Sequence, residues 1–480
     1  MASVVETAIR GAVTKGIGVI SDFNRKRLPD LDRPHPFLTG IHEPMTGEET
    51  LEDLKVTGNI PAQLDGRYLR IGPNPVTPPD PKTYHWFTGD GMAHGIRVKD
   101  SKALWYHNRW MRSNEVSAAL GEAPAPGLRS QRTDNANTNI IGHAGRTYAI
   151  VEAGGWPIEL DDGLNTIAHN PFDGSLNVSF SAHPHRDMKT NELHAICYDA
   201  PVMNKIWHVV VDAVGKVTRQ EPITVEHGPS IHDCALTENY VLVFDLPVTF
   251  SMKSLIGGHA FPYAWNEKHQ ARVGLCPRNG SGAETIWCDV EPCYVFHPAN
   301  AFEDKDGNVI VDVVAHETMF ATSTLGPDSP ASRLERWTID KTTQKVTRKV
   351  IHDQPQEFPR YNEQLTSQPY RYIYDIALAS EGMIEMNVEE TRLFKHDLES
   401  GTVLERNFGD RRHPGEFVFV PRDGGTKEDD GWLVGLVVDM NNQTSELQIL
   451  NADDFTGEAQ AIIHIPHRIP PGFHGNWVDA

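Results

Sequence analysis

Four segments that lie far apart in the chain share one pattern, and this pattern constrains the fold more than any other feature. In each segment a short strand-like run reaches an Asp or Asn, crosses a polar turn and returns as a second run. Such hairpins, recurring at intervals of roughly 55 to 130 residues, indicate the blades of a circular β-fold, with further copies too diverged to recognise. The segments are His208–Gln220, Arg336–Lys349, Leu393–Arg406 and Leu447–Gln460.

The rest of the chain also consists mostly of short strand-like runs, and long amphipathic helices are scarce. At about 65 to 70 residues per blade, 480 residues suffice for about seven blades. We therefore predict an all-β fold, a seven-bladed β-propeller with loops and short helices that form a cap over a site on its axis. Two β-sandwich domains are the alternative. We place an N-terminal helical extension at residues 1–30 and the single propeller domain at residues 31–480.

The charge and cysteine content exclude several classes of protein. With 44 Lys and Arg against 65 Asp and Glu, the net charge of −21 repels phosphate backbones, so we expect no nucleic-acid partner. The five cysteines are odd in number and show no CxxC spacing, so neither a disulfide framework nor a cysteine zinc site is indicated. We expect a cytoplasmic protein, and the sequence leaves its oligomeric state open.

The N-terminus carries apolar side chains at near-helical spacing. No stretch of the chain reaches the ~18 apolar residues of a membrane span, and the regions of a signal peptide are missing. We expect a helix that packs on its own protein; the alternative is a helix that makes weak peripheral contact with a membrane and helps to draw an apolar substrate from lipid. The apolar residues are Val4, Val5, Ala8, Ile9, Ala12, Val13, Ile17 and Ile20.

Four histidines stand out because each lies in a turn-like or strand-end segment rich in Pro, Gly or Asn. They are spread over roughly 290 residues, too far for a local zinc module, so only a closed circular fold would bring them together. Any one of the 23 histidines taken alone is best explained by a structural or surface role. Four neutral imidazoles suit Fe, Cu, Zn or Ni and leave a divalent ion with open positions. The four are His183, His232, His297 and His474.

Such a centre needs acceptors that hold each ring by its other N–H group, and carboxylates also offset the charge of the metal. The candidates are Glu152, Glu357 and Glu416, each in or beside an apolar, strand-like segment. A carboxylate is costly in such a segment unless it is paired. The alternative for each is a glutamate on the surface.

These histidine and glutamate segments resemble the carotenoid cleavage oxygenase family, which includes members that cleave apocarotenoids or stilbenes. The resemblance extends from Gly58–Pro75 and Phe87–Val98 to the GFHGNWV segment near the C-terminus, with the motifs in the same order. The family fold is a seven-bladed propeller that holds a non-haem Fe(II) on its axis with four histidines. The resemblance therefore implies Fe(II) as cofactor and, as its ligands, His183, His232, His297 and His474.

The resemblance also implies roles for other residues. The three glutamates would orient three of the four rings, and Thr138 matches the small residue whose methyl group faces one vacant iron position in the family. His185, His227 and His467 fall outside the motif positions, and we expect structural roles for them.

The implied reaction is the oxidative cleavage of a C=C bond by O2 into two carbonyl products, without an organic cofactor. The sequence agrees, since it shows no GxSxG motif, no P-loop and no dinucleotide fingerprint. A propeller that only binds an apolar ligand, with structural zinc at the histidines, is the alternative from another class.

Two substrate classes compete. One is a long conjugated polyene, a carotenoid or apocarotenoid, in an apolar tunnel; the other is a phenylpropenoid or stilbene whose ring hydroxyl is held by polar groups. In family members that cleave phenolic stilbenes, a lysine precedes the first of the glutamates, but here that position is Val151. This departure favours the polyene. Ordinary core packing or the tunnel wall explains three segments with aromatic residues and methionine, Trp105–Met111, Phe250–Tyr263 and Met319–Phe320.

Overall fold

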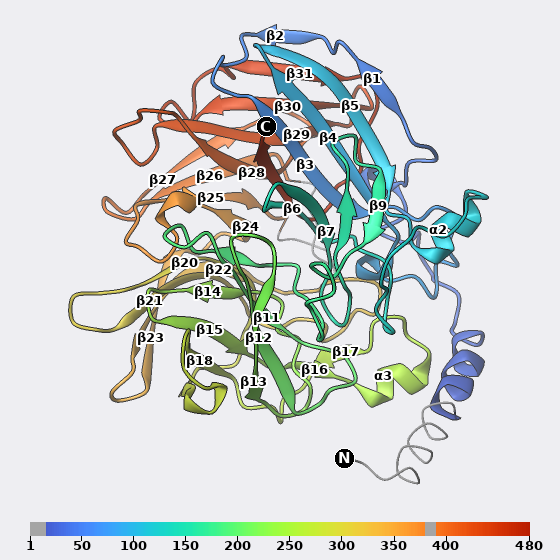
Figure 1. Ribbon diagram of the computed structural model, residues 1–480, viewed down its shortest axis with the longest axis vertical. Coiled ribbons are helices and arrows are strands. Elements are labelled where there is room, and N and C mark those ends of the chain that lie inside the picture. The colour runs from blue at the N-terminus through green and yellow to red at the C-terminus, as the bar shows by residue number, and fades with distance from the viewer. Residues whose placement is uncertain (1–15, 380–389) are drawn as a thin grey trace.

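The computed structural model describes residues 16–379 and 390–480, and in this part of the chain seven antiparallel sheets surround one axis (Figure 1). Five sheets take four consecutive strands of the chain, apart from one insertion. These are β6 (Asn139–His143) to β9 (Thr166–His169), β10 (His185–Arg186) to β13 (Val217–Thr224), β14 (Cys234–Leu236) to β19 (Ile286–Asp289), β20 (Tyr294–Glu303) to β23 (Lys345–His352), and β24 (Gln356–Arg360) to β27 (Thr402–Asn407).

The strands between these bounds complete the five blades. They are β7 (Arg146–Ile150), β8 (Ile158–Leu160), β11 (Leu193–Cys197), β12 (Lys205–Val211), β15 (Tyr240–Asp245), β18 (Arg272–Pro277), β21 (Val309–His316), β22 (Ser332–Asp340), β25 (Tyr372–Ala377) and β26 (Arg392–Asp397).

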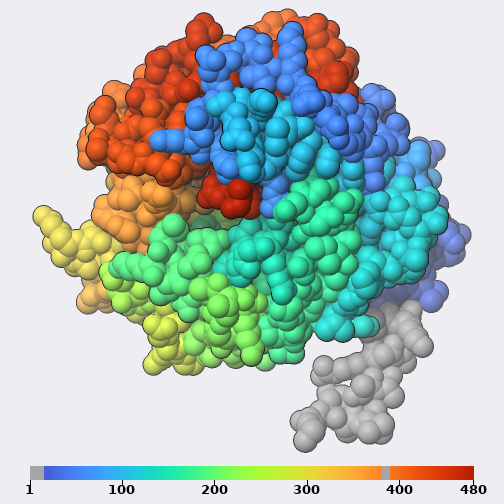
Figure 2. Space-filling model, turned by 45° about the horizontal axis from the view of Figure 1, so that its top comes forward, coloured from blue at the N-terminus to red at the C-terminus, as the bar shows by residue number. Residues whose placement is uncertain are grey.

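The other two sheets combine strands from both ends of the chain. The first contains β1 (Thr50–Glu52), β5 (Lys102–Trp110), β4 (Gly91–Lys99), β3 (Gly66–Pro73) and β32 (Gly475–Asp479). The second contains β28 (Arg412–Pro421), β29 (Gly431–Asp439), β30 (Thr444–Asn451), β31 (Ala461–Ile465) and β2 (Val56–Gly58). Figure 2 shows these blue and red segments against one another. The predicted seven-bladed propeller is confirmed, and the arrangement is not that of two β-sandwiches.

The inner strand of each blade faces the axis; it is β32 in the sheet of β1, β3, β4 and β5, β28 in the sheet of β2, β29, β30 and β31, and the first strand in the other five blades. Contacts link β32 to β6 and to β28, and further contacts run from β10 through β14, β20 and β24 to β28. The ring closes because β32 pairs with β3, with Leu69 opposite Asn476, and β2 pairs with β31, with Thr57 opposite Ile462. Residues at corresponding heights of different blades therefore converge on the axis.

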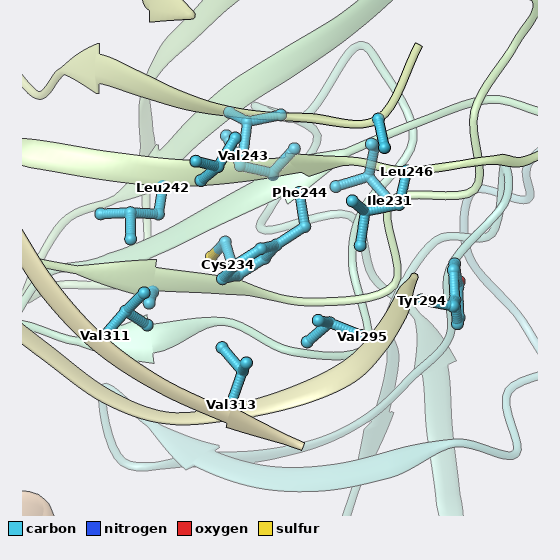
Figure 3. Packing of buried hydrophobic residues seen from close by; sticks show 14 of the residues in the cluster. Ile231, Cys234, Leu242, Val243, Phe244, Leu246, Tyr294, Val295, Val311 and Val313 are labelled. Atoms are coloured by element: carbon cyan, nitrogen blue, oxygen red, sulfur yellow. The ribbon is translucent and has the colours of Figure 1, made fainter. Parts of the chain in front are cut away.

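Apolar side chains fill the space between neighbouring blades. In the largest core cluster, Cys234 and Phe244 of one blade face Val311 and Val313 of the next, all of them buried (Figure 3). This packing explains why the strands read as runs of β-branched and aromatic residues, since both faces of most sheets are covered.

The four repeated segments are confirmed as hairpins near the outer edge of their blades: β12–β13, β22–β23, β26–β27 and β30–β31. The blade of β14 to β19 also has an insertion between β15 and β18. This insertion contains β16 (Val248–Phe250), α3 (Met252–Gly257) and β17 (Tyr263–Trp265). Further short helices are α2 (Asn114–Ala119) and the 3-10 turns η1 (Gly40–His42), η2 (Trp86–Thr88), η3 (Gly282–Glu284) and η4 (Glu363–Leu365).

A helix over residues 16–25 lies beside α3 (Figure 1). The Asn24 Nδ2 group donates to the Ile256 carbonyl at 2.7 Å, and Arg25 Nε donates to the Gly258 carbonyl at 3.1 Å. The apolar residues from Val4 to Val13 lie outside the described residues. Within the described residues no helix is long and apolar enough to cross a membrane. The domain boundary at residue 30 stays a prediction.

We predict that Gly91→Ala destabilises the protein by at least about 2 kcal/mol. A Cβ atom at Gly91 would lie 1.8 Å from the Ala136 carbonyl oxygen, so β4 and the chain before β6 would have to separate. Gly47→Ala is the matched control, because a Cβ atom there meets nothing within 4 Å. The measurement is the midpoint of thermal or denaturant unfolding for the three proteins. Equal midpoints would show that the two segments separate without cost.

Candidate metal centre

Each inner strand brings one predicted site residue to the axis. This residue lies either in the first half of the strand or one or two positions before the strand begins. The residues are Thr138 before β6, His183 before β10, His232 before β14, His297 in β20, Glu357 in β24, Glu416 in β28 and His474 before β32. Glu152 is the exception, since it follows β7, the second strand of its blade. Residues scattered through the sequence meet because each occupies the same place in a different blade.

The four histidines form one buried cluster. They offer ligand nitrogens that all lie within 4.8 Å of one another, and His232 Nε2 lies 3.2 Å from His297 Nε2. Each of the four is at most 7% exposed. His183 Nε2 is buried without a hydrogen-bond partner among the described residues. Burial and the neighbouring histidines, His232 first, hold the pKa of His183 well below its ordinary value, so its ring is neutral and suited to bind a metal.

Three of the rings are held from behind by a carboxylate. Glu152 Oε1 lies 2.9 Å from His232 Nδ1, Glu357 Oε2 lies 2.6 Å from His297 Nδ1, and Glu416 Oε1 lies 3.1 Å from His474 Nδ1. When Nδ1 donates to a carboxylate, the lone pair of Nε2 is left for a metal. The pairing of glutamates with rings thus fits the arrangement expected around a metal ion.

Two of these glutamates are anchored by further bonds. Glu357 also accepts from His316 Nε2 at 2.8 Å, and the Oε2 atom of Glu416 accepts from the Gly475 N–H at 2.9 Å. Burial alone would raise the pKa of Glu416, but Arg360, His474 and the Gly475 N–H lower it to about 2. Burial is likewise outweighed at Glu357, whose pKa His297 and His316 lower. Both groups are therefore ionised at neutral pH.

Within residues 16–379 and 390–480, no glutamate hydrogen-bonds to the fourth ring, His183. Its Nδ1 atom lies 3.7 Å from Asp233 Oδ2, and Asp233 Oδ1 accepts a hydrogen bond from His185 Nε2 at 2.8 Å. Burial works against a charge on His185, but Asp233 raises its pKa. Sequence reasoning gave Asp233 no role; its position directly after His232 was the available signal.

The other two histidines that fall outside the motif positions lie away from the centre. His227 contacts His269 at 3.0 Å between the Nδ1 atoms, and His467 Nε2 lies 3.3 Å from the Tyr106 hydroxyl. Both make the kind of structural contact that was expected for them.

Irregularities in three inner strands aim neighbouring side chains at the same space. The register of β20 shifts between Val295 and Pro298, and that of β24 shifts between Glu357 and Arg360. Phe358 has a φ of 57°, which is rare for an aromatic residue and marks a strained backbone. A regular strand would send adjacent side chains to opposite faces. The bulges instead let Phe296 line the same cavity as His297, and Phe358 the same cavity as Glu357. The β28 strand shifts similarly between Pro414 and Phe417.

A cavity of about 510 Å³ opens on one side of the cluster. Thr138 lines it, and the Thr138 hydroxyl donates to Asn137 Oδ1 at 2.9 Å. A smaller cavity of about 190 Å³, which His183 lines, has a wall that includes the polar residues Asp233, His185 and Arg360. The aromatic lining of the larger cavity comprises Trp86, Phe87, Phe261, Phe296, Phe358, Phe473, Tyr198 and Tyr263.

The sequence identified this lining only in part. Residues 260–263, the end of the expected segment Phe250–Tyr263, line the cavity, whereas Trp105–Met111 and Met319–Phe320 do not. For Trp105–Met111 the alternative of core packing holds, because most of this segment forms β5, which lies far from the inner strand in its sheet. Phe320 packs behind the wall, with its ring 4.8 Å from that of Phe261. Phe296, Phe358 and Phe473 were missed, although each is adjacent to a motif residue.

Comparisons with known proteins agree with this geometry. Residues 42–479 match the model of the family described as retinal pigment epithelial membrane protein (RPE65). The chain is 40% identical to a carotenoid cleavage oxygenase of Mycobacterium tuberculosis, over 92% of this chain and 97% of that protein. The structure resembles a Synechocystis apocarotenoid oxygenase (TM-score 0.81, 28% identity, 92% of this chain and 98% of that one). It also resembles a Pseudomonas brassicacearum lignostilbene dioxygenase (TM-score 0.84, 26% identity, 94% and 100%).

We predict that Glu416→Gln weakens metal retention on the order of 10- to 100-fold, because the variant keeps the shape of the side chain but removes the charge behind His474. The measurement is a titration of metal-free protein with Fe(II) under nitrogen. Glu363→Gln is the control, since Glu363 contacts the same Arg360 at 2.8 Å and is more than half exposed. Equal affinity in all three proteins would remove Glu416 from the metal centre.

Proposed function

Since the chain belongs to the RPE65 or carotenoid cleavage oxygenase family, we propose that it is a non-haem Fe(II) dioxygenase that cleaves a C=C bond of a carotenoid or apocarotenoid. The reaction would consume O2 and give two carbonyl products. The single observation that carries the proposal is the cluster of four buried histidines, three of which (His232, His297 and His474) line a cavity with eight aromatic side chains in its wall. A polyene placed in that cavity would lie directly beside the histidines.

The residues present fit an iron ion. His183, His232, His297 and His474 would hold it, and the unpartnered, buried Nε2 atom of His183 is the kind of lone pair that a metal satisfies. Fe(II) bound in this way would supply the activation of O2 beside the alkene. The glutamates fix the rings, while the aromatic wall holds the alkene close and excludes water. No side chain is required as a general acid or base.

The apolar wall supports a polyene substrate. Val151 lines the cavity directly before Glu152 and offers no polar group to a phenol. Phe87, Phe296 and Phe473 present flat faces and edges that suit a conjugated chain.

A phenylpropenoid or stilbene remains the second candidate substrate, for a specific reason. The likeness to the lignostilbene dioxygenase has a TM-score of 0.84, and the same cavity wall contains the hydroxyl groups of Tyr198 and Tyr263. The non-catalytic alternative is a carrier with structural zinc. Measuring which metal the protein holds, and whether it turns over a substrate, distinguishes this carrier from both enzymes.

We further propose that one face of the protein makes weak contact with a lipid surface. On the helix over residues 16–25, Val19, Ile20 and Phe23 are 69%, 50% and 53% exposed. The adjoining α3 contains Met252, which is 47% exposed, and no residue of α3 is buried. Residues 260–263, close behind α3 in the chain, line the cavity, so a substrate leaving lipid at this face would have a short path.

We predict that protein reconstituted with Fe(II) under nitrogen and then given O2 cleaves an apocarotenal. The products are identified by mass spectrometry, with ¹⁸O2 as the oxygen source. Isoeugenol is offered in parallel, and its conversion to vanillin would assign the protein to the phenolic class instead. Tightly held zinc and no turnover of either substrate would favour the carrier.

His232→Ala should lose both iron and activity while the fold survives, because the variant removes one of the four nitrogens of the cluster. His227→Ala is the matched control, since His227 lies nearby in the sequence but contacts His269 instead. Iron is measured by metal analysis and the fold by circular dichroism. Full activity in His232→Ala would contradict the assignment of this ligand.

For the lipid contact, we predict that replacing Ile20 and Phe23 together by Ser lowers co-sedimentation with phosphatidylcholine vesicles several-fold, because these exposed side chains would supply most of the buried apolar area. Replacing the exposed Val214 by Ser is the control; it lies in the turn between β12 and β13 and is 80% exposed. Equal co-sedimentation of the wild-type protein and both variants would show that this face does not bind the vesicles.

A further inference from the structure

The smaller cavity, of about 190 Å³, also reaches the histidine cluster. His183, His297 and His474 line it, whereas His232, His297 and His474 line the larger cavity. The wall of the smaller cavity also contains Glu363, whose side chain is 54% exposed, so this cavity opens towards solvent. Two cavities therefore lead to the cluster, and they differ in what they can admit.

The larger cavity suits an apolar molecule better than a hydrated ion. Eight aromatic side chains line it, and the ring of Phe296 lies 4.9 Å from that of His232 between centroids. A divalent cation that loses its water needs polar groups in return, and an aromatic wall offers few of them. Three aromatic side chains line the smaller cavity, together with residues that carry carboxylate, imidazole, amide or hydroxyl groups.

Asp233 and His185 form a second group of metal-binding type, and both line the smaller cavity. Asp233 Oδ1 lies 2.8 Å from His185 Nε2, and Asp233 Oδ2 lies 3.7 Å from His183 Nδ1. Ligand atoms of His185, Asp233 and Cys234 all lie within 4.8 Å of one another. Cys234 is fully buried and does not line the cavity, so an ion there would meet the imidazole and the carboxylate. Both ligand types bind divalent first-row metals such as Fe(II).

Asp233 is the acid in this wall that is most available to a cation. The other two acids, Glu363 and Glu416, contact Arg360 at 2.8 and 3.4 Å. In the described part of the chain no Lys or Arg lies within 4 Å of the Asp233 carboxylate. Arg186 is the second arginine in the wall, so three acids face two arginines and the balance favours a cation.

His183 is the ring best placed to receive an ion from this cavity. Among the four histidines, it is the one that lines the smaller cavity but not the larger one. The other three rings are each held by a glutamate, whereas no glutamate among the described residues hydrogen-bonds to His183. A ring that no carboxylate fixes can turn more easily, so it can take up an ion and turn with it towards the other three nitrogens.

We infer that divalent metal enters through the smaller cavity, and that Asp233 and His185 bind the ion on its way to the histidine cluster. The two residues form a transfer site, which holds the incoming ion while its waters are exchanged for ring nitrogens, beginning with His183. Bonds between the metal and its ligands are the only bonds that change, and the waters of the ion are released. The inference rests on the proposed function, since it concerns the loading of the same metal centre.

A transfer site differs in its kinetics from a group that supports the bound metal. A group on the path lowers the barrier in both directions, so its loss slows uptake and release by the same factor and leaves the dissociation constant unchanged. A group that stabilises the bound ion changes the dissociation constant instead, mainly through the rate of release. Rates of uptake and release therefore distinguish the two roles.

The test follows Co(II) uptake by metal-free protein under nitrogen in a stopped-flow absorbance experiment, and the release of Co(II) into an excess of chelator. Metal analysis at fixed times repeats the uptake with Fe(II). Asp233→Asn and His185→Gln each remove one ligand, and circular dichroism shows whether each variant folds. His269→Gln is the matched control, because His269 Nε2 lies 2.8 Å from Asp245 Oδ1 and this pair lines neither cavity.

We expect Asp233→Asn and His185→Gln to take up and release Co(II) about 10-fold more slowly or less, with an unchanged dissociation constant and one ion bound per chain at the end. His269→Gln should match the wild-type protein. Slower uptake and release in either folded variant supports the inference. Normal rates in the folded variants, or weaker binding with normal uptake, would overturn it.

A second arm tests the larger cavity as the route, since Glu115 and Asp134 also line it. An apocarotenal is added to metal-free protein under nitrogen, where it is not cleaved, and quenching of tryptophan fluorescence shows that it is bound. We expect an unchanged rate of Co(II) uptake, because the polyene occupies the larger cavity and leaves the smaller one open. Uptake that stops would assign the entry of metal to the larger cavity and contradict the inference.

Neither arm measures turnover, so the inference and the proposed function fail separately. A protein that loads metal through the smaller cavity but cleaves no substrate would contradict the proposed function alone. A protein that cleaves an apocarotenal but loads metal at the wild-type rate in both folded variants would contradict the transfer site alone.

Discussion

The closure of the ring by β32 is the constraint on which the site depends. Pairing of β32 with β3 turns a linear series of sheets into a circle, and it places His474 beside histidines from the middle of the chain. Each blade then contributes one or two side chains at the level of the cluster. No local segment could build this centre, because neighbouring residues on one strand point to opposite faces.

The electrostatics of the centre follow from that geometry. Imidazole binds a metal in its neutral form, so a divalent ion held by the four rings would bring two positive charges into a buried space, and the nearby carboxylates of Glu152, Glu357 and Glu416 would offset them. The positive charge of Arg360, whose Nη1 atom lies 3.4 Å from Glu416 Oε1, partly neutralises the negative charge of the carboxylates. The carboxylates thus both orient the rings and make the buried charge tolerable.

The sequence predicted the fold, and it singled out eight residues that the structure places around one axis, because their signals are local: hairpin turns, strand ends and short motifs. The structure brings the four histidines together and sets a glutamate behind three of them, as the motifs implied. Phe358 could not be found in this way, since its contribution depends on a bulge and a positive φ that no propensity predicts. For Phe250–Tyr263 the sequence left core packing and the tunnel wall as alternatives, and only the structure shows that residues 260–263 line the cavity.

Glu152 is held by fewer hydrogen bonds than the other two glutamates. Its Oε1 atom lies 2.9 Å from His232 Nδ1, while its Oε2 atom is buried without a hydrogen-bond partner among the described residues. Both oxygens of Glu357 and both oxygens of Glu416 accept hydrogen bonds from the protein. The orientation of a metal-binding ring depends on how firmly its carboxylate partner is held, so His232 is the least restrained of the three rings that a glutamate holds.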